Sequence, residues 1–309
     1  MKILVMGAGG VGGYFGARLQ QGGNDVAFVA RGRHLEALQR NGLKLKSPLG
    51  DAALQVKAFE DPAQAGAADV VLFTVKLWDT ESAGARLRPA LGPDSVVIPF
   101  QNGVESIELL STVLPAKAVM GGAAYIAARI AEPGVIVQTG EFARLRFGPV
   151  QAAQRPRAQA FLAACQGAGI AAELAEDIVR VLWEKFVLLV GVSSATALAR
   201  APLGTVRADP DLRWLLESAL RETWAVAVKR GIALPENFVA KLLSQIDKLP
   251  ADMKASLAAD LESGGRLEAP WLCGAVARMS REAGLEAPVN RAVYAALKPY
   301  VGGSQVKAR

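Results

Sequence analysis

The first twelve residues constrain the fold more than any other stretch of the chain. An apolar strand pattern from Ile3 to Met6 runs directly into the turn Gly7-Ala8-Gly9-Gly10-Val11-Gly12, and a helical pattern follows. A strand, a glycine turn and a helix in this order are the fingerprint of a dinucleotide-binding unit. Gly7 would allow the tight turn, Gly9 the approach of a pyrophosphate, and Gly12 close packing of helix on strand. We therefore expect residues 7–12 to bind a nucleotide.

Length and composition indicate a folded protein of about two domains. The chain has 309 residues, of which 51% are hydrophobic and 21% charged, so it can form more than one core. The net charge of +6 is not gathered into a basic stripe, and we expect no nucleic-acid partner. The single histidine, His34, excludes a site built from several histidines, and no metal is expected.

The chain carries few signs of export or of membrane association. Cys165 and Cys273 could form one disulfide, but a chain of this size does not need it, and buried thiols are expected instead. The N-terminus reads as a strand without a charged and then apolar leader. The longest apolar run, Phe186 to Ala199, is too short and too rich in Gly, Ser and Thr to cross a bilayer. We expect a cytoplasmic protein.

The first half of the chain alternates strand and helix patterns. Strands are expected at Lys2–Met6, Asp25–Val29, Val70–Val75 and Val96–Phe100, and helices at Gly12–Gly22, Arg33–Asn41, Thr80–Leu91 and Val104–Leu114. Such alternation predicts a parallel sheet with right-handed crossovers. Shorter strands are expected at Ala118–Ala127, Gly134–Gln138 and Ala143–Phe147, with a small hairpin that joins Leu43–Leu45 to Leu54–Val56.

From about Glu176 strand patterns disappear and long helical patterns replace them. These cover Glu176–Ala199, Asp209–Arg230, Pro235–Leu249 and Ala269–Glu282. The fold class is therefore α/β, with an N-terminal Rossmann-type doubly wound sheet followed by an all-helical C-terminal domain. We place the nucleotide-binding domain at residues 1–175 and the helical substrate and catalytic domain at 176–309, with the active site in the cleft between them.

The end of the second strand favours NADP over NAD. Domains that prefer NAD usually place a carboxylate there for the ribose 2′-hydroxyl. Here Asp25–Val29 is followed by Arg31 and Arg33, and a guanidinium matches a phosphate in a bidentate fork. The alternative is that both arginines are solvated loop residues. His34 is expected to begin the next helix and to pack near the adenine or a phosphate.

Two further strand ends place polar groups at the same edge of the sheet. Lys76 follows the buried strand Val70–Val75 and could reach a phosphate or the adenosine, although a surface lysine at a strand end is the alternative. Gln101-Asn102-Gly103 follows the strand Val96–Phe100, so that the amide of Asn102 could touch both nicotinamide and substrate. An Asn-Gly pair alone is only a turn signal.

Lys185 lies in a helical pattern that is apolar on nearly every face. Burial lowers the pKa of a lysine, and a lysine brought toward neutrality can donate a proton. Ser193 follows on the same helical stripe. The alternative is a lysine whose long stem carries its amine to the surface. Ser256 and Asp260 are spaced one helical turn apart and Glu268 precedes a helix start, positions that ordinary surface and N-terminal residues also occupy.

Taken together, these motifs make the chain resemble the ketopantoate reductase (2-dehydropantoate 2-reductase) family from Met1 to about Lys298. The likeness rests on the order and spacing of Gly7 to Gly12, Arg31, Thr74-Val75-Lys76, Gln101-Asn102-Gly103, Trp183-Glu184-Lys185, Ser256 with Asp260, and Gly265-Arg266-Leu267-Glu268. It implies NADPH-dependent reduction of ketopantoate to pantoate, a step of pantothenate synthesis.

The resemblance also implies a role for each matching residue. Lys185 would be the proton donor, Asn102 would touch nicotinamide and substrate, and Arg31 and Lys76 would hold the adenosine phosphate. Ser256 would contact the substrate, Glu268 would lie beside the cofactor and the lysine, and the backbone of Ala128 would touch the cofactor.

Three positions depart from the family pattern. Leu189, Ser193 and Leu203 stand where the family often has asparagine, and each lost amide removes hydrogen bonds worth about 0.5–1.5 kcal/mol. Ser193 could replace one of them as a substrate contact. We expect a small-molecule 2-oxo acid substrate, with a more apolar carbonyl compound as one alternative and a non-catalytic NADP(H) sensor as another. The oligomeric state, including a homodimer, stays open.

Overall fold

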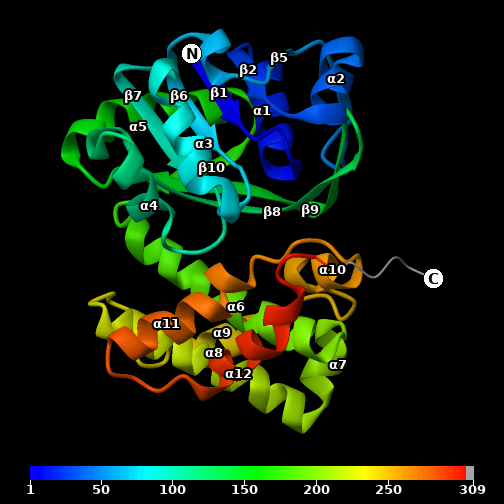
Figure 1. Ribbon diagram of the computed structural model, residues 1–309, viewed down its shortest axis with the longest axis vertical. Helices are drawn as coiled ribbons and strands as arrows, with labels where there is room; N and C mark the ends of the chain where they lie inside the picture. The colour runs from blue at the N-terminus through cyan, green and yellow to red at the C-terminus, as the bar shows by residue number, and fades with distance from the viewer. Residues whose placement is uncertain (304–309) are drawn as a thin grey trace. The chain divides into compact units, whose positions relative to one another are not determined.

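The computed structural model describes residues 1–303, which form two compact units (Figure 1). The first unit comprises Met1–Val181, and the second begins at Leu182. Helix α6 (Ile178–Ala199) carries the chain from one unit into the other. The predicted boundary, after residue 175, lies just ahead of this helix, whereas the two units divide within its first turn.

The first unit is built around a sheet of five parallel strands in the order β5-β2-β1-β6-β7. These strands are β1 (Lys2–Met6), β2 (Asp25–Val29), β5 (Lys57–Phe59), β6 (Ala68–Phe73) and β7 (Leu91–Pro99). In register, Met6 lies opposite Val29 on one side and Phe73 on the other. The chain order reverses between β1 and β6, and in such sheets ligands bind at the carboxyl ends of the strands beside this point.

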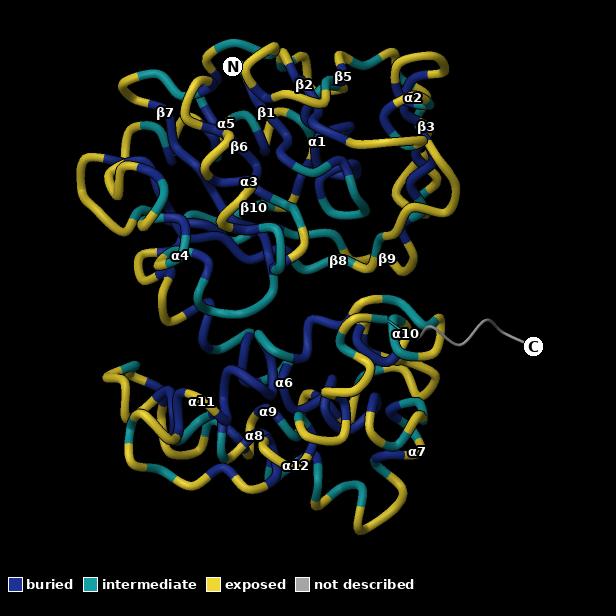
Figure 2. The backbone as a smooth tube through the Cα atoms, in the orientation of Figure 1, coloured by how far each residue is buried: buried dark blue, intermediate teal, exposed yellow. Residues whose placement is uncertain are grey.

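Both faces of this sheet are buried, as the predicted doubly wound fold requires. Ile3 and Val5 pack in one core, and Leu4 and Met6 pack in the other. The first core includes residues of α1 (Gly10–Gln21), α2 (Gly32–Asn41) and α5 (Arg155–Gly167), and the second includes residues of α3 (Thr80–Arg86) and α4 (Ser106–Val113). Figure 2 shows the central strands as buried. The predicted fold class is confirmed.

A second, mixed sheet packs on the first core. It contains β3 (Leu43–Lys46), β4 (Ala52–Leu54), β8 (Gly121–Glu132), β9 (Val135–Gly148) and β10 (Ala171–Leu174). The predicted hairpin is confirmed, since Leu43 pairs with Leu54. The two short strands expected at 134–138 and 143–147 are wrong as separate elements, because β9 runs through both. The expected break persists as a bulge, where the pair Ile126–Ala143 is followed by Ala127–Thr139.

The described part of the second unit is entirely helical after α6, which confirms the helical prediction. Its helices are α7 (Leu203–Ala208), α8 (Pro210–Lys229), α9 (Phe238–Ile246), α10 (Ser256–Glu262), α11 (Cys273–Glu282) and α12 (Pro288–Leu297). Local sequence explains the start of α8. The side chain of Asp209 accepts hydrogen bonds from the N–H groups of Asp211 and Leu212, and Pro210 occupies the first helical position.

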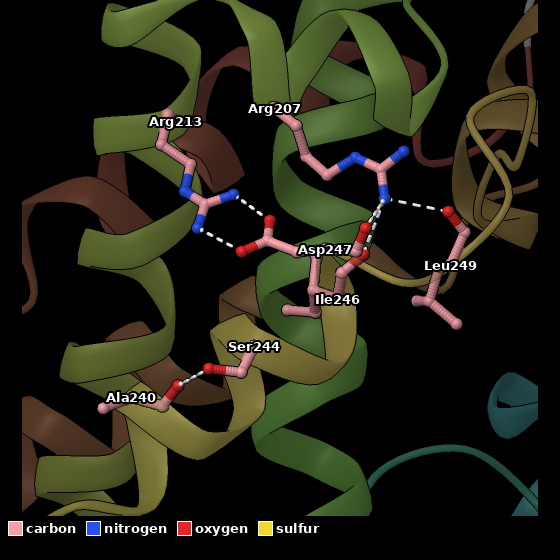
Figure 3. Close-up of polar contacts among 7 residues, drawn as sticks. All are labelled: Arg207, Arg213, Ala240, Ser244, Ile246, Asp247 and Leu249. Carbon is pink, nitrogen blue, oxygen red and sulfur yellow. Dashed lines mark hydrogen bonds and ion pairs between the residues drawn. The ribbon is translucent and has the colours of Figure 1, made fainter.

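Arginines fasten three of these helices together (Figure 3). The Nη1 of Arg207 donates to the carbonyl oxygens of Ile246, Asp247 and Leu249 at 2.8, 2.9 and 2.8 Å. Ile246 is the last residue of α9, and Asp247 and Leu249 follow it, in the region where a helix leaves carbonyls without helical partners. Arg213 of α8 forms a bidentate ion pair with the carboxylate of Asp247. Charge-assisted bonds to carbonyls therefore fix α7, and the ion pair fixes α8, against the end of α9.

Helix α6 corrects one expectation about membranes. The expected apolar run started at Phe186, but the helix spans 22 residues and is long and apolar enough to cross a bilayer. In the structure, 72% of its most apolar window is buried inside the protein. Such burial is typical of the core helix of a globular domain. The two cysteines, Cys165 and Cys273, are buried free thiols, as expected.

Candidate functional site

The glycine turn joins the ends of the three central strands. Gly7 has φ +104°, a conformation that favours glycine, and a Cβ there would lie 2.9 Å from the backbone nitrogen of Val75. The N–H groups of Gly7 and Ala8 both donate to the carbonyl of Val29, at 3.2 and 3.0 Å. The turn is therefore fixed against the carboxyl ends of both neighbouring strands.

The other glycines differ in the space around them. A Cβ on Gly12 would lie 2.2 Å from the carbonyl oxygen of Gly7 and 2.8 Å from Val5 Cγ1, so α1 packs directly on β1. A Cβ on Gly10 would lie 2.2 Å from the carbonyl oxygen of Ala128, which places β8 against the start of α1. No atom lies within 4 Å of a Cβ on Gly9. The open side of the turn is thus the side where a pyrophosphate is expected.

A cavity of about 350 Å³ lies at this edge of the sheet. It is lined by the ends of β1, β2 and β6 and by the segments that follow them, and it brings together five of the predicted cofactor residues, namely Gly7, Ala8, Gly9, Arg31 and Lys76. A larger cavity of about 640 Å³, lined by residues such as Tyr14 and Phe142, contains none of the predicted site residues. The smaller cavity is therefore the candidate nucleotide site.

Charged side chains of both signs line the smaller cavity. Arg31 lies just beyond the end of β2, and its Nη2 lies 2.7 Å from the Oδ2 of Asp79. Lys76 follows β6, and its Nζ lies 5.7 Å from the centroid of the Trp78 ring, within cation–π range. Arg33 is exposed on α2 and is not among the lining residues. Of the two arginines expected at the end of β2, Arg31 lines this cavity, where it pairs with Asp79, a carboxylate that sequence reasoning missed.

His34 also lines this cavity and is hydrogen-bonded to the glycine turn. Its Nε2 donates to the carbonyl of Ala8 at 2.8 Å, and its Nδ1 accepts from the N–H of Gly134 at 3.1 Å. This pair of bonds requires a proton on Nε2 and none on Nδ1. Burial lowers the pKa of His34, while the bond to Ala8 raises it. The neutral ring therefore positions the turn, a role that the sequence analysis did not assign.

Asn102 follows β7, the next strand after β6. It is partly buried, and Gly103 behind it adopts φ +89°. The neighbouring Gln101 donates from Nε2 to the carbonyl of Val75 at 2.8 Å and to the hydroxyl of Thr80 at 2.9 Å. Gln101 thereby ties the ends of β6 and β7 together, a positioning role that sequence reasoning did not assign. Asn102 itself does not line the nucleotide cavity.

In the second unit, Lys185 and Glu268 form an electrostatic pair. Lys185 lies in α6 and is half-buried, close to the buried Trp183 and Phe186. Burial lowers the pKa of its amine from 10.5 to about 8, and the charge of Glu268 opposes this effect. Glu268 is itself buried, with 7% of its surface exposed. A lysine with such a pKa is charged at neutral pH and can release its proton readily.

The remaining predicted substrate residues differ in burial. Ser193, also on α6, is buried, and its hydroxyl oxygen has no hydrogen-bond partner within residues 1–303. Ser256 is exposed at the start of α10, one turn before Asp260, and no geometry distinguishes it from an ordinary surface hydroxyl. Leu203 is fully buried at the start of α7 and serves packing. Ser193 therefore has the stronger structural case as a ligand contact.

Comparisons with known proteins match two successive parts of the chain. The family model described as ketopantoate reductase PanE/ApbA matches residues 3–152, and the model for its C-terminal part matches residues 177–301. An uncharacterized oxidoreductase, YkpB, from Bacillus subtilis is 30% identical over 97% of this chain and 99% of its own length. A 2-dehydropantoate 2-reductase from Archaeoglobus fulgidus is 31% identical over 94% of each chain.

Solved structures show the same relationship. The crystal structure of a PanE/ApbA family ketopantoate reductase from Ralstonia eutropha superimposes with a TM-score of 0.88 at 30% identity, covering 97% of this chain and 98% of that one. The two family models match successive ranges that together span most of the chain. The chain therefore belongs to the ketopantoate reductase family, and it is an oxidoreductase of the kind that uses a nicotinamide nucleotide.

Proposed function

We propose that this protein reduces a 2-oxo acid with NADPH, and that 2-dehydropantoate (ketopantoate) is the substrate and pantoate the product. The observation that carries the proposal is the environment of Lys185. Burial lowers the pKa of its amine to about 8, and the charge of Glu268 acts against this lowering. Reduction of a carbonyl requires a proton at its oxygen, and an acid with a pKa near working pH is suited to supply it. A protein that only senses the nucleotide has no need of such a group.

The nucleotide would be held mainly by the first unit. When bound, a nicotinamide nucleotide supplies the hydride that reduces the carbonyl carbon. The turn from Gly7 to Gly12 offers its open side at Gly9 and the N-terminus of α1 to the pyrophosphate. Arg31 and Lys76 line the same cavity and would bind the 2′-phosphate. Asn102, the backbone of Ala128, and Glu268 complete the proposed cofactor contacts.

The substrate would be oriented by the polar side chains predicted from the sequence. The unpartnered hydroxyl of buried Ser193 supports a hydrogen bond to the substrate, since an unsatisfied buried oxygen is costly. Asn102 and Ser256 are proposed as further contacts by family likeness. The ammonium of Lys185 would donate its proton to the carbonyl oxygen as negative charge develops there, and then regain one from solvent.

One observation supports a second candidate substrate class. Leu189 lies one helical turn after Lys185 on α6 and cannot replace an asparagine amide. A 2-oxo acid with a more apolar side chain than ketopantoate would leave no hydroxyl unpaired at that position. The two candidates share the reaction and the proton donor, and they differ only in the group that faces Leu189.

A panel of 2-oxo acids separates these proposals. NADPH oxidation is followed by absorbance with ketopantoate, with its analogue lacking the hydroxyl, and with apolar 2-oxo acids. The highest kcat/KM with ketopantoate supports the primary proposal, and the highest value with an apolar acid supports the second. Tight NADPH binding without oxidation by any member of the panel overturns both and indicates a sensor.

A further inference from the structure

We infer that Asp79 is a specificity-determining residue that weakens the preference of this protein for NADPH over NADH. Asp79 ends the short segment Leu77–Asp79 after β6, and its carboxylate lies 2.7 Å from the guanidinium of Arg31. Both side chains line the cavity that contains Gly7, Ala8 and Gly9. The inference rests on the proposed nucleotide site in that cavity.

The backbone of Asp79 at the start of α3 leaves its side chain free of the helix end. An aspartate in the residue before a helix normally accepts a hydrogen bond from the first free N–H groups. Asp61 and Asp209 make that bond from extended backbone, with ψ 120° and 125°, whereas Asp79 has ψ 2° and closes a 3₁₀ turn that continues into α3. Asp79 makes no such bond, and its carboxylate is directed to Arg31 instead. The carboxylate therefore contributes to the cavity and not to the cap of α3.

This placement restores a carboxylate to the region where NAD-preferring domains carry one. In such domains an acidic residue near the end of the second strand accepts a bond from the ribose 2′-hydroxyl. Here β2 ends in Val29 and leads to Arg31, and the carboxylate arrives from the segment after β6. Arg31 and Asp79 thus present a phosphate ligand and a hydroxyl acceptor side by side.

The two nucleotides make opposite demands on this pair. A 2′-phosphate binds Arg31 in competition with Asp79 and is repelled by the remaining carboxylate. A 2′-hydroxyl can donate to Asp79 while the ion pair stays intact. The side chain of Arg31 is 65% exposed and that of Asp79 is 24% exposed, so the ion pair is weak enough for Arg31 to be recruited. Asp79 therefore penalises NADPH selectively.

The test compares nucleotide affinities in Asp79→Asn and in a matched control. Asp25→Asn removes a carboxylate from an exposed ion pair with Lys57 at the opposite end of the same strand β2, so it changes the net charge equally. Dissociation constants for NADPH and NADH are measured by nucleotide fluorescence at fixed salt. We expect Asp79→Asn to bind NADPH about three- to tenfold more tightly, with NADH unchanged or weaker, and Asp25→Asn to change neither.

A second variant tests competition for Arg31 directly. In an Arg31→Gln background, Asp79→Asn should give a smaller gain in NADPH affinity, because no guanidinium remains to be released. Equal gains in both backgrounds, or equal effects on NADPH and NADH, overturn the inference. Asp79→Ser repeats the comparison with a side chain of different shape. Failure of the wild-type protein to bind either nucleotide instead overturns the proposed site itself.

Discussion

Replacement of Lys185 by methionine should make the protein more stable at neutral pH. The pKa of Lys185 is lowered to about 8 in the folded protein, from an ordinary value of 10.5. At every pH below about 8 the amine is charged in both states, and the folded state bears the cost of partly removing that charge from water. Methionine has a similar length and no charge, so Lys185→Met removes this cost.

The magnitude and its pH window follow from the two pKa values. A pKa difference of this size corresponds to about 3 kcal/mol of unfolding free energy. Between pH 8 and 10.5 the unfolded chain binds more protons than the folded protein, so wild-type stability rises with pH in this interval. The advantage of Lys185→Met should therefore be largest below pH 8 and should disappear above pH 10.5.

Urea denaturation of both proteins, followed by circular dichroism at a series of pH values, measures the effect. The control is Lys241→Met, which removes an exposed lysine of α9 and should change the unfolding free energy by less than about 0.5 kcal/mol at any pH. A Lys185→Met protein that is less stable than wild type near neutral pH, with a difference that does not change with pH, would refute the reasoning.

The remaining predictions concern the site and its support. In the wild type, kcat/KM should fall as pH rises through about 8, because Lys185 then loses its proton. Glu268→Gln should move this fall to lower pH, because the charge of Glu268 raises the pKa of Lys185. The pH–rate profiles of both proteins measure the shift. Gly12→Ala should abolish nucleotide binding and destabilise the first unit by about 1–3 kcal/mol, because the added Cβ would lie 2.2 Å from the Gly7 carbonyl oxygen. Calorimetry measures the loss, and the control is Gly167→Ala, whose added Cβ would meet nothing within 4 Å. Arg207→Met should lower the unfolding free energy by about 1.5–3 kcal/mol, because it removes three hydrogen bonds to carbonyls. The control is Arg221→Met, which breaks the i,i+4 ion pair with Glu217 and should lower the unfolding free energy by less than about 0.5 kcal/mol.

Features encoded in adjacent residues were predictable from the sequence. The strand, turn and helix at residues 1–21 carry their glycines in fixed order, and the structure gives Gly7 and Gly12 the conformation and close packing that this order predicts. The lowered pKa of Lys185 follows from a helix that is apolar on nearly all faces. In both cases one short segment contains the whole signal.

Features that depend on distant residues were missed. Asp79 meets Arg31 across 48 positions of sequence, and nothing near Asp79 distinguishes it from an ordinary helix cap. The short strands β5 and β10 have only three and four residues, too few to show a period. Helix α5 buries only Ala158, Phe161 and Cys165, so it shows little apolar period in the sequence.

The central claim is that Lys185 donates the proton in a nicotinamide-dependent reduction. Parallel measurement of the NADPH dissociation constant and of kcat in wild type and Lys185→Ala tests it most directly. The account predicts an unchanged dissociation constant and a kcat lower by about 10²- to 10⁴-fold. A Lys185→Ala protein that binds NADPH and turns over the preferred 2-oxo acid at the wild-type rate would contradict it.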